Sequence, residues 1–265
     1  MKIAFIGGGN MASALIGGLL ARGAKRSAIC VIEPVPAARR RLAAKFKVHA
    51  SAFLDARALA ADTVVLAVKP QDMRAAAAPL MGRLGARLVI SVAAGIRLKD
   101  LARWLGGHDR IVRVMPNTPC LIGSGAAGYA LGPGASVADG ELVGRLMRAV
   151  GIAFAVPESQ LDAVTGLSGS GPAYVYTMIE ALSDGGVRAG LPRATATALA
   201  AQTVFGAAQM VMSTGEHPGV LKDRVTSPGG TTIAGLQVLE QHGLRAALID
   251  AVEAATNRSR ELGQS

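Results

Sequence analysis

The stretch Ile3-Ala4-Phe5-Ile6-Gly7-Gly8-Gly9-Asn10-Met11-Ala12 decides the fold of this chain. Its four apolar residues are typical of a buried strand, and an apolar helical pattern starts directly after the glycines. Gly7, Gly9 and Ala12 have the spacing G-x-G-x-x-A, which permits a tight turn, close approach of a pyrophosphate and tight packing of helix on strand. The helix start adds free N–H donors for an anion. We therefore predict a dinucleotide-binding domain whose cofactor contacts include Gly7, Gly9, Asn10, Met11 and Ala12.

Strand and helix patterns alternate after this stretch. Apolar runs typical of strands occupy residues 3–6, 28–32, 63–68, 88–92, 111–114 and, more briefly, 153–156. Helical patterns occupy residues 11–22, 37–45, 73–84, 98–105 and 139–150. This alternation predicts an α/β fold, a Rossmann-type doubly wound parallel sheet, as domain 1–157.

The pattern changes after residue 157. Long, alanine-rich helical stretches follow at residues 174–189, 193–213, 218–225, 232–241 and 244–262. A domain of about 100 such residues cannot bury all of its apolar helix faces by itself. We predict that residues 158–265 form an all-helical substrate-binding and dimerisation domain, and that the protein is a homodimer or a larger oligomer of dimers.

The amino-acid composition indicates which binding partners to expect. The net charge of +10 comes from scattered basic residues, and only 3% of the residues are aromatic, so nucleic acid is not an expected partner. A positive field also attracts an anionic cofactor or substrate. Cys30 and Cys120 match no ligand spacing, which indicates neither a metal site nor a disulfide and favours a reducing compartment. Residues 194–215 carry no charge but seven polar side chains, so we expect no membrane span. Without an export signal the expected location is the cytoplasm.

The end of the second strand selects between the two nicotinamide cofactors. Glu33 lies 21 residues beyond Ala12, where an acidic group accepts hydrogen bonds from a ribose 2′-hydroxyl and repels a 2′-phosphate. Arg39, Arg40 and Arg41 begin the next helix and could reach such a phosphate instead. The expected cofactor is NADH or NADPH, with Glu33 favouring NADH.

Two later loops also follow predicted strands. Ligands of a doubly wound sheet bind beyond the carboxyl ends of its strands. We therefore expect cofactor contacts from two groups of residues, Ala67-Val68-Lys69-Pro70 and Asn117-Thr118. Simple turn chemistry is the alternative for both groups, because Pro and Asn favour turns.

A second glycine turn, Thr226-Ser227-Pro228-Gly229-Gly230-Thr231-Thr232, lies in the helical half. It leads into a helix start and directs several backbone N–H groups and hydroxyls at one small volume. Such a turn suits the carboxylate of a small substrate. Substrate choice is therefore expected from Gly229, Gly230, Thr231 and Thr232.

Five segments in this order resemble pyrroline-5-carboxylate reductases over essentially the whole chain. They are the glycine loop from Gly7 to Ala12, Ala67-Val68-Lys69-Pro70, Met115-Pro116-Asn117-Thr118-Pro119, Ser168-Gly169-Ser170-Gly171-Pro172-Ala173-Tyr174 and the 226–232 loop. The resemblance implies a dimerising helical domain and reduction of Δ1-pyrroline-5-carboxylate to L-proline with NAD(P)H. It also implies that Thr232 lies beside the imine nitrogen and that Gly229, Gly230 and Thr231 hold the carboxylate. Glu33 departs from the polar or basic residue of many NADPH-preferring members.

The chemistry leaves two alternatives. The related β-hydroxyacid dehydrogenases carry a lysine four residues after the second glycine of a segment like Gly169-Ser170-Gly171, where this chain has Val175. That absence disfavours an alcohol dehydrogenase, which needs a general acid. A cyclic imine arrives already protonated, so the protein mainly has to position ring and cofactor. A non-catalytic dinucleotide sensor is the other alternative, although it has no need of a second anion-binding turn.

Overall fold

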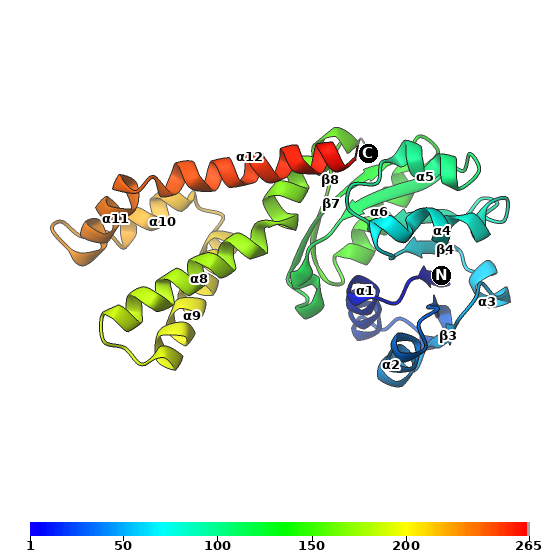
Figure 1. Cartoon of the computed structure of the whole chain (residues 1–265), viewed down its shortest axis with the longest axis horizontal. Helices are drawn as coiled ribbons and strands as arrows, with labels where there is room; N and C mark the ends of the chain where they lie inside the picture. Colours follow the sequence, from blue (N-terminus) through cyan, green and yellow to red (C-terminus); the bar gives the residue numbers. More distant parts are fainter. Residues whose placement is uncertain (264–265) are drawn as a thin grey trace. The chain divides into compact units, whose positions relative to one another are not determined.

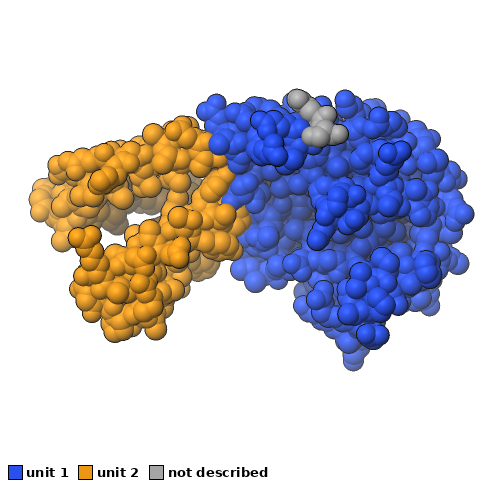
Figure 2. All heavy atoms as spheres, in the orientation of Figure 1, with its two compact units in different colours: residues 1–170, 253–265 blue, residues 171–252 orange. Residues whose placement is uncertain are grey.

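The computed structural model describes residues 1–263 and consists of two compact units. The first unit contains residues 1–170 together with the C-terminal residues from Glu253, and the second contains residues 171–252 (Figure 2).

An eight-stranded sheet forms the centre of the first unit (Figure 1). Its order is β3-β2-β1-β4-β5-β6-β7-β8, and the first six strands in this order are parallel. The strands are β1 (Ile3–Ile6), β2 (Ile29–Ile32), β3 (His49–Ser51), β4 (Thr63–Leu66), β5 (Leu88–Ser91), β6 (Ile111–Met115), β7 (Gly125–Leu131) and β8 (Gly151–Ala155). This is the order of a doubly wound dinucleotide-binding sheet, so the predicted fold class is confirmed.

Two strands escaped prediction. β3 has only three residues, His49-Ala50-Ser51, and none of them favours a strand strongly. β7 begins with Gly-Ala-Ala-Gly and runs antiparallel to β6. Both strands form because they pair with a neighbouring strand of the sheet, and local composition does not reveal such pairing.

Helices cover both faces of this sheet. They are α1 (Asn10–Ala21), α2 (Pro36–Phe46), α3 (Ala56–Leu59), α4 (Met73–Ala77), α5 (Leu98–Trp104), α6 (Val137–Met147) and α7 (Leu161–Val164). The continuous helix predicted for residues 73–84 is wrong: α4 ends at Ala77 and a 3₁₀ turn, Ala78–Leu80, follows. Pro79 lies in that turn and has no N–H with which to continue the helical ladder.

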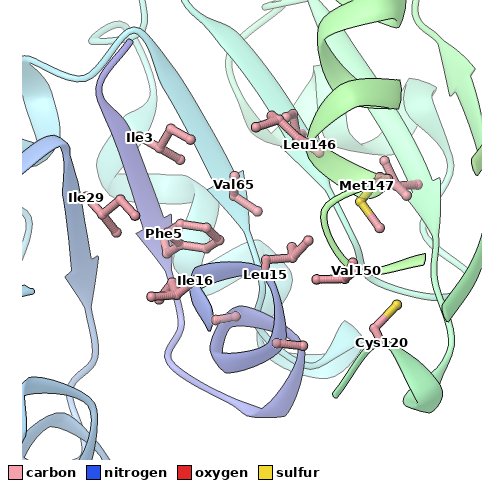
Figure 3. Close-up of a cluster of buried hydrophobic side chains, with 14 of the residues drawn as sticks. Ile3, Phe5, Leu15, Ile16, Ile29, Val65, Cys120, Leu146, Met147 and Val150 are labelled. Atoms are coloured by element: carbon pink, nitrogen blue, oxygen red, sulfur yellow. The ribbon is translucent and has the colours of Figure 1, made fainter. Parts of the chain in front are cut away.

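The core has one layer on each face, because successive strand residues point to opposite sides. Phe5 of β1 packs with Leu15 and Ile16 of α1 on one face (Figure 3). Leu66 of β4 packs with Met73 of α4 on the other. The first unit is thus stabilised by its own buried apolar layers.

The second unit is purely helical and contains α8 (Gly171–Arg188), α9 (Arg193–Thr214), α10 (Pro218–Arg224), α11 (Thr231–Gln241) and the first part of α12 (Leu244–Leu262). Of residues 171–252, only Ser183, Ala196 and Ala200 are buried. Open space is visible within this unit in Figure 2. Its helices therefore do not close around a core of their own.

Among residues 1–263, no helix combines the length and the apolar character needed to cross a membrane. This includes α9, which covers most of the uncharged stretch.

Candidate active site

The glycines of the loop between β1 and α1 have different roles: one is required by the backbone conformation, and another leaves space for a ligand. Gly7 has φ +96°, and a Cβ on it would lie 2.8 Å from the carbonyl oxygen of Ala67. Only glycine tolerates this combination of backbone angle and close contact. A Cβ on Gly9, in contrast, would meet no atom within 4 Å. The open space over Gly9, at the start of α1, is what a pyrophosphate requires, so these residues fit a dinucleotide.

Gly8 connects this loop to the end of β2. Its N–H donates to Oε2 of Glu33 at 2.8 Å, and a Cβ on Gly8 would overlap the Leu42 side chain of α2. The other carboxylate oxygen, Oε1, accepts a hydrogen bond from the N–H of Val35 at 2.9 Å. Glu33 is buried, and its carboxylate braces both the glycine loop and the turn that follows β2.

Arg39 acts on the same turn from α2. Its guanidinium Nη1 donates to the carbonyl oxygens of Glu33 at 2.8 Å and Pro34 at 3.0 Å. This arginine therefore ties the start of α2 to the end of β2. Arg40 and Arg41 are exposed.

A cleft of about 830 Å³ opens beside the glycine loop, which we call the glycine-loop cleft. It is lined by residues 6–9, 32–35, 52–54, 67–69, 71, 72, 75, 76, 79 and 80. The structure thus brings six of the predicted cofactor residues into one cleft: Gly7, Gly9, Glu33, Ala67, Val68 and Lys69. They come from the carboxyl ends of β1, β2 and β4, as ligand binding to a doubly wound sheet requires.

The other predicted cofactor residues lie outside the lining of this cleft. Asn10, Met11 and Ala12 form the first turn of α1, and Pro70 begins a 3₁₀ turn after β4. Thr118 is exposed at the start of another 3₁₀ turn after β6. Their contacts with a cofactor remain predictions.

Asn117 is engaged with the protein itself. Its Nδ2 donates to the carbonyl oxygen of Ser168 at 3.0 Å, and its Oδ1 accepts from the N–H of Ala126 at 2.9 Å. Ser168 lies in a π-helical turn, Thr165–Gly169, in which the N–H of Ser170 reaches back to the carbonyl of Thr165 at 2.8 Å. The side chain of Asn117 therefore links the loop after β6 to β7 and to a turn type that often marks functional sites.

The 226–232 loop belongs to the second unit. Gly229 has φ +66°, and the N–H of Gly230 donates to the carbonyl of Ser227 at 3.1 Å, which closes the turn. α11 then begins at Thr231, with the half-buried Thr232 as its second residue. The first N–H groups of a helix have no intrahelical partner, so this turn can receive an anion.

Sequence reasoning missed part of each region. One wall of the glycine-loop cleft comes from residues 52–54, which follow the unpredicted strand β3. In the 226–232 loop, the Ser227 hydroxyl lies where a Cβ on Gly230 would be, so Ser227 shapes the turn together with the glycines. The alternation of polar and apolar residues from Lys47 to Ala52 was a sequence signal for the first, and a serine before Pro-Gly-Gly was one for the second.

The doubly wound sheet, the open glycine loop and the acidic residue at the end of β2 define a dinucleotide-binding protein of the Rossmann class. Residues 2–95 match the family of coenzyme F420-dependent NADP oxidoreductases, and residues 158–262 match the pyrroline-5-carboxylate reductase dimerisation family.

Relatives match over the full length. A pyrroline-5-carboxylate reductase of Arabidopsis thaliana is 50% identical over 266 residues, which cover 100% of this chain and 96% of the relative. The solved structure of a pyrroline-5-carboxylate reductase from Coxiella burnetii has 40% identity and a TM-score of 0.95, with 100% of this chain and 99% of that chain covered. The Plasmodium falciparum pyrroline carboxylate reductase, solved with NADP bound, has 33% identity and a TM-score of 0.87, with 99% and 98% covered. This chain belongs to the pyrroline-5-carboxylate reductase family.

Proposed function

We propose that this protein reduces Δ1-pyrroline-5-carboxylate to L-proline, the last step of proline biosynthesis, with a reduced nicotinamide cofactor. The observation that carries the proposal is full-length membership of the family; an open glycine loop after β1 and a glycine turn at the start of α11 support it. The family match disfavours the β-hydroxyacid dehydrogenase alternative, and the second turn disfavours a non-catalytic sensor.

The proposed reaction does not require a strongly acidic side chain. The cofactor supplies a hydride, which adds to the carbon of the protonated C=N bond and leaves the ring nitrogen as an amine. The turn of Gly229, Gly230 and Thr231 holds the substrate carboxylate, although the N–H of Gly230 is already used to close the turn on Ser227. The Thr232 hydroxyl accepts a hydrogen bond from the protonated ring nitrogen. No strong acid is needed, because the nitrogen already carries its proton; holding the ring in the reactive orientation is the main task of the protein.

On the cofactor side we assign Gly7, Gly9, Asn10, Met11 and Ala12 to the pyrophosphate. Ala67, Val68, Lys69 and Pro70 form a second wall, and Asn117 and Thr118 serve the nicotinamide end. The hydrogen bonds of Asn117 give it an indirect part, in which it holds the loop that carries Thr118.

NADH is the proposed preferred cofactor. The Glu33 carboxylate lies at the end of β2, where a 2′-phosphate of NADPH would meet its charge. Lys69 is the only cation among the residues that line the glycine-loop cleft, and Arg39 is held by two carbonyl oxygens. A 2′-phosphate therefore lacks the arginine fork that usually accommodates it.

The active protein is proposed to be a cytoplasmic homodimer or an oligomer of dimers, with the functional division of the chain near residue 157. The dimerisation family begins at residue 158, and the helices of residues 171–252 expose their apolar faces.

Turnover measured with both cofactors tests the proposal. Purified protein is mixed with pyrroline-5-carboxylate and either NADH or NADPH, and loss of the nicotinamide absorbance is followed. We expect turnover with a higher kcat/KM for NADH; absence of turnover with both cofactors contradicts the proposed reaction.

The variant Glu33→Gln separates charge from structure, because its amide oxygen can still accept one of the two backbone hydrogen bonds. Its ratio of kcat/KM for NADPH over NADH should rise. If the wild-type protein prefers NADPH strongly, the assignment of Glu33 is wrong while the reaction stands.

A further inference from the structure

Phe53 is an exposed aromatic side chain at the wall of the glycine-loop cleft. Its side chain is 80% exposed, although most large apolar residues of the first unit are buried. It lies two residues after the end of β3 and belongs to the lining of the cleft. An exposed phenyl ring forgoes the free energy of burial, so a ligand that covers it would gain from the contact.

Hydrogen bonds hold the backbone of Phe53 in place. The Ser51 hydroxyl donates to the carbonyl of Phe53 at 2.9 Å and accepts from its N–H at 3.4 Å. The carbonyl of Ser51 accepts from the N–H of Glu33 at 2.9 Å, which ties this segment to the end of β2. The exposed ring is thus presented by a braced loop.

The far end of the same loop is also fixed. His49 and Asp55 are joined at 2.6 Å between Nε2 and Oδ2, and Oδ1 of Asp55 accepts from the N–H of Ala58, which caps α3. Residues 52–54 are therefore a short loop closed at its base. A side chain on such a loop can meet a ligand with little loss of conformational entropy.

The position of Phe53 identifies the part of the ligand that it meets. In a doubly wound sheet the acidic residue at the end of the second strand contacts the ribose of the adenosine half. β3 pairs with β2, with Ile32 opposite Ser51, so Phe53 lies one strand further out on that same side. Ala76 and Pro79 add apolar surface to this cleft, whose one cationic lining residue is Lys69, after β4.

We propose that the ring of Phe53 stacks on the adenine of the cofactor and sets cofactor affinity. Phe53 is a binding residue for the part of the cofactor that does not react, so it acts on the KM for NADH and not on kcat. This inference rests on the proposed use of a nicotinamide dinucleotide.

The variant Phe53→Ala tests the inference, with Phe53→Trp as the variant that restores a ring. We expect Phe53→Ala to raise the Kd and KM for NADH about tenfold, the effect of a lost base–aromatic stack. kcat should be unchanged, and Phe53→Trp should return the Kd to near the wild-type value. Val137→Ala is the matched control, because Val137 is 78% exposed at the start of α6 and outside the cleft.

Reduced nicotinamide mononucleotide, which lacks the adenosine half, gives a second readout. The wild-type protein and Phe53→Ala should use it with equal kcat/KM. An equal loss with this truncated cofactor, a lower kcat with NADH or an unchanged Kd for NADH would each overturn the inference. The Kd is measured by titration without substrate, so a failure of the proposed reaction would not hide the result.

Discussion

Two phenylalanines show how differently the two units are stabilised. Phe5 in β1 is 1% exposed and lies in the centre of the first unit, whereas Phe205 in α9 of the second unit is 59% exposed. The first unit buries apolar layers on both faces of its sheet. The second unit contains comparably apolar helices but buries almost nothing. The second unit therefore leaves an apolar surface exposed, which another molecule can cover.

Residues 158–262 match a dimerisation family, and we propose that a second copy of the chain covers this surface. In this interpretation the first unit carries the cofactor on a self-sufficient scaffold, and the second unit carries the substrate turn on helices that depend on assembly.

A charge in the apolar face of α9 should abolish assembly. The variant Phe205→Asp would bury an unpaired carboxylate between copies, which costs several kcal/mol. We expect monomeric or unfolded protein by light scattering after size exclusion, with activity reduced more than about a hundredfold. Val137→Asp is the control in the first unit, because Val137 is exposed and an acidic residue suits a helix start. An assembled and active Phe205→Asp protein would refute the difference between the units.

Removal of the Thr232 hydroxyl should slow the reaction without affecting cofactor binding. We expect Thr232→Ala to lower kcat roughly tenfold to a thousandfold, the span of a lost positioning hydrogen bond. Thr232→Ser keeps the hydroxyl and should retain most of the activity. Steady-state kinetics measure the loss of kcat, and an NADH titration checks that cofactor binding by the first unit is unchanged. An unchanged kcat in Thr232→Ala would remove this residue from the mechanism.

A methyl group on Gly9 should block cofactor binding without unfolding the first unit. No atom lies within 4 Å of the position of its Cβ, so Gly9→Ala costs little in the absence of ligand. We expect the Kd for NADH to rise about tenfold to a hundredfold, since the backbone no longer admits the pyrophosphate. Gly7→Ala is the contrasting variant, because φ +96° and the nearby Ala67 carbonyl predict lower thermal stability. Wild-type affinity in Gly9→Ala would place the pyrophosphate elsewhere.

The smallest effect concerns two Arg–Asp pairs of equal length, one in each unit. Arg110 and Asp139 lie 2.7 Å apart with Asp139 buried, and Arg193 and Asp184 lie 2.7 Å apart with both exposed. The hydrogen bond from Arg110 lowers the pKa of Asp139 to about 2; burial opposes this shift, and hydrogen bonds from Ser136 add to it. Asp139→Asn should reduce the free energy of unfolding by about 2 kcal/mol at neutral pH, and Asp184→Asn by less than about 0.5 kcal/mol.

The pH dependence follows from the depressed pKa of Asp139. Its stabilisation is fully present above the ordinary value of 3.8 and is lost as the pH falls toward 2, so the difference between Asp139→Asn and wild type should vanish there. Denaturant titrations at several pH values measure it. A large loss in Asp184→Asn at neutral pH would indicate that assembly buries that pair as well.

The sequence predicted most of the first unit because its signals are local. β1, the glycine turn and α1 follow from ten consecutive residues, and the predicted strand at residues 3–6 coincides with β1. The failures have tertiary causes: β3 and β7 depend on pairing with neighbouring strands, and Pro79 interrupts a helix that its alanines favour. For the site, chain order alone indicated Gly9, Glu33 and Lys69 at strand ends, but it did not reveal that Phe53 joins them.

By itself, the sequence determined the alternation of strands and helices, the glycine spacing at Gly7, Gly9 and Ala12, and the acidic residue at position 33. These features depend on residues close together in the chain, where backbone geometry and periodicity are sufficient. Only the tertiary structure decided that Gly8 donates to Glu33, that Asn117 is held by Ser168 and Ala126, and that the second unit has no core. Each of these depends on contacts between distant segments, whose free energies appear only when the chain is folded.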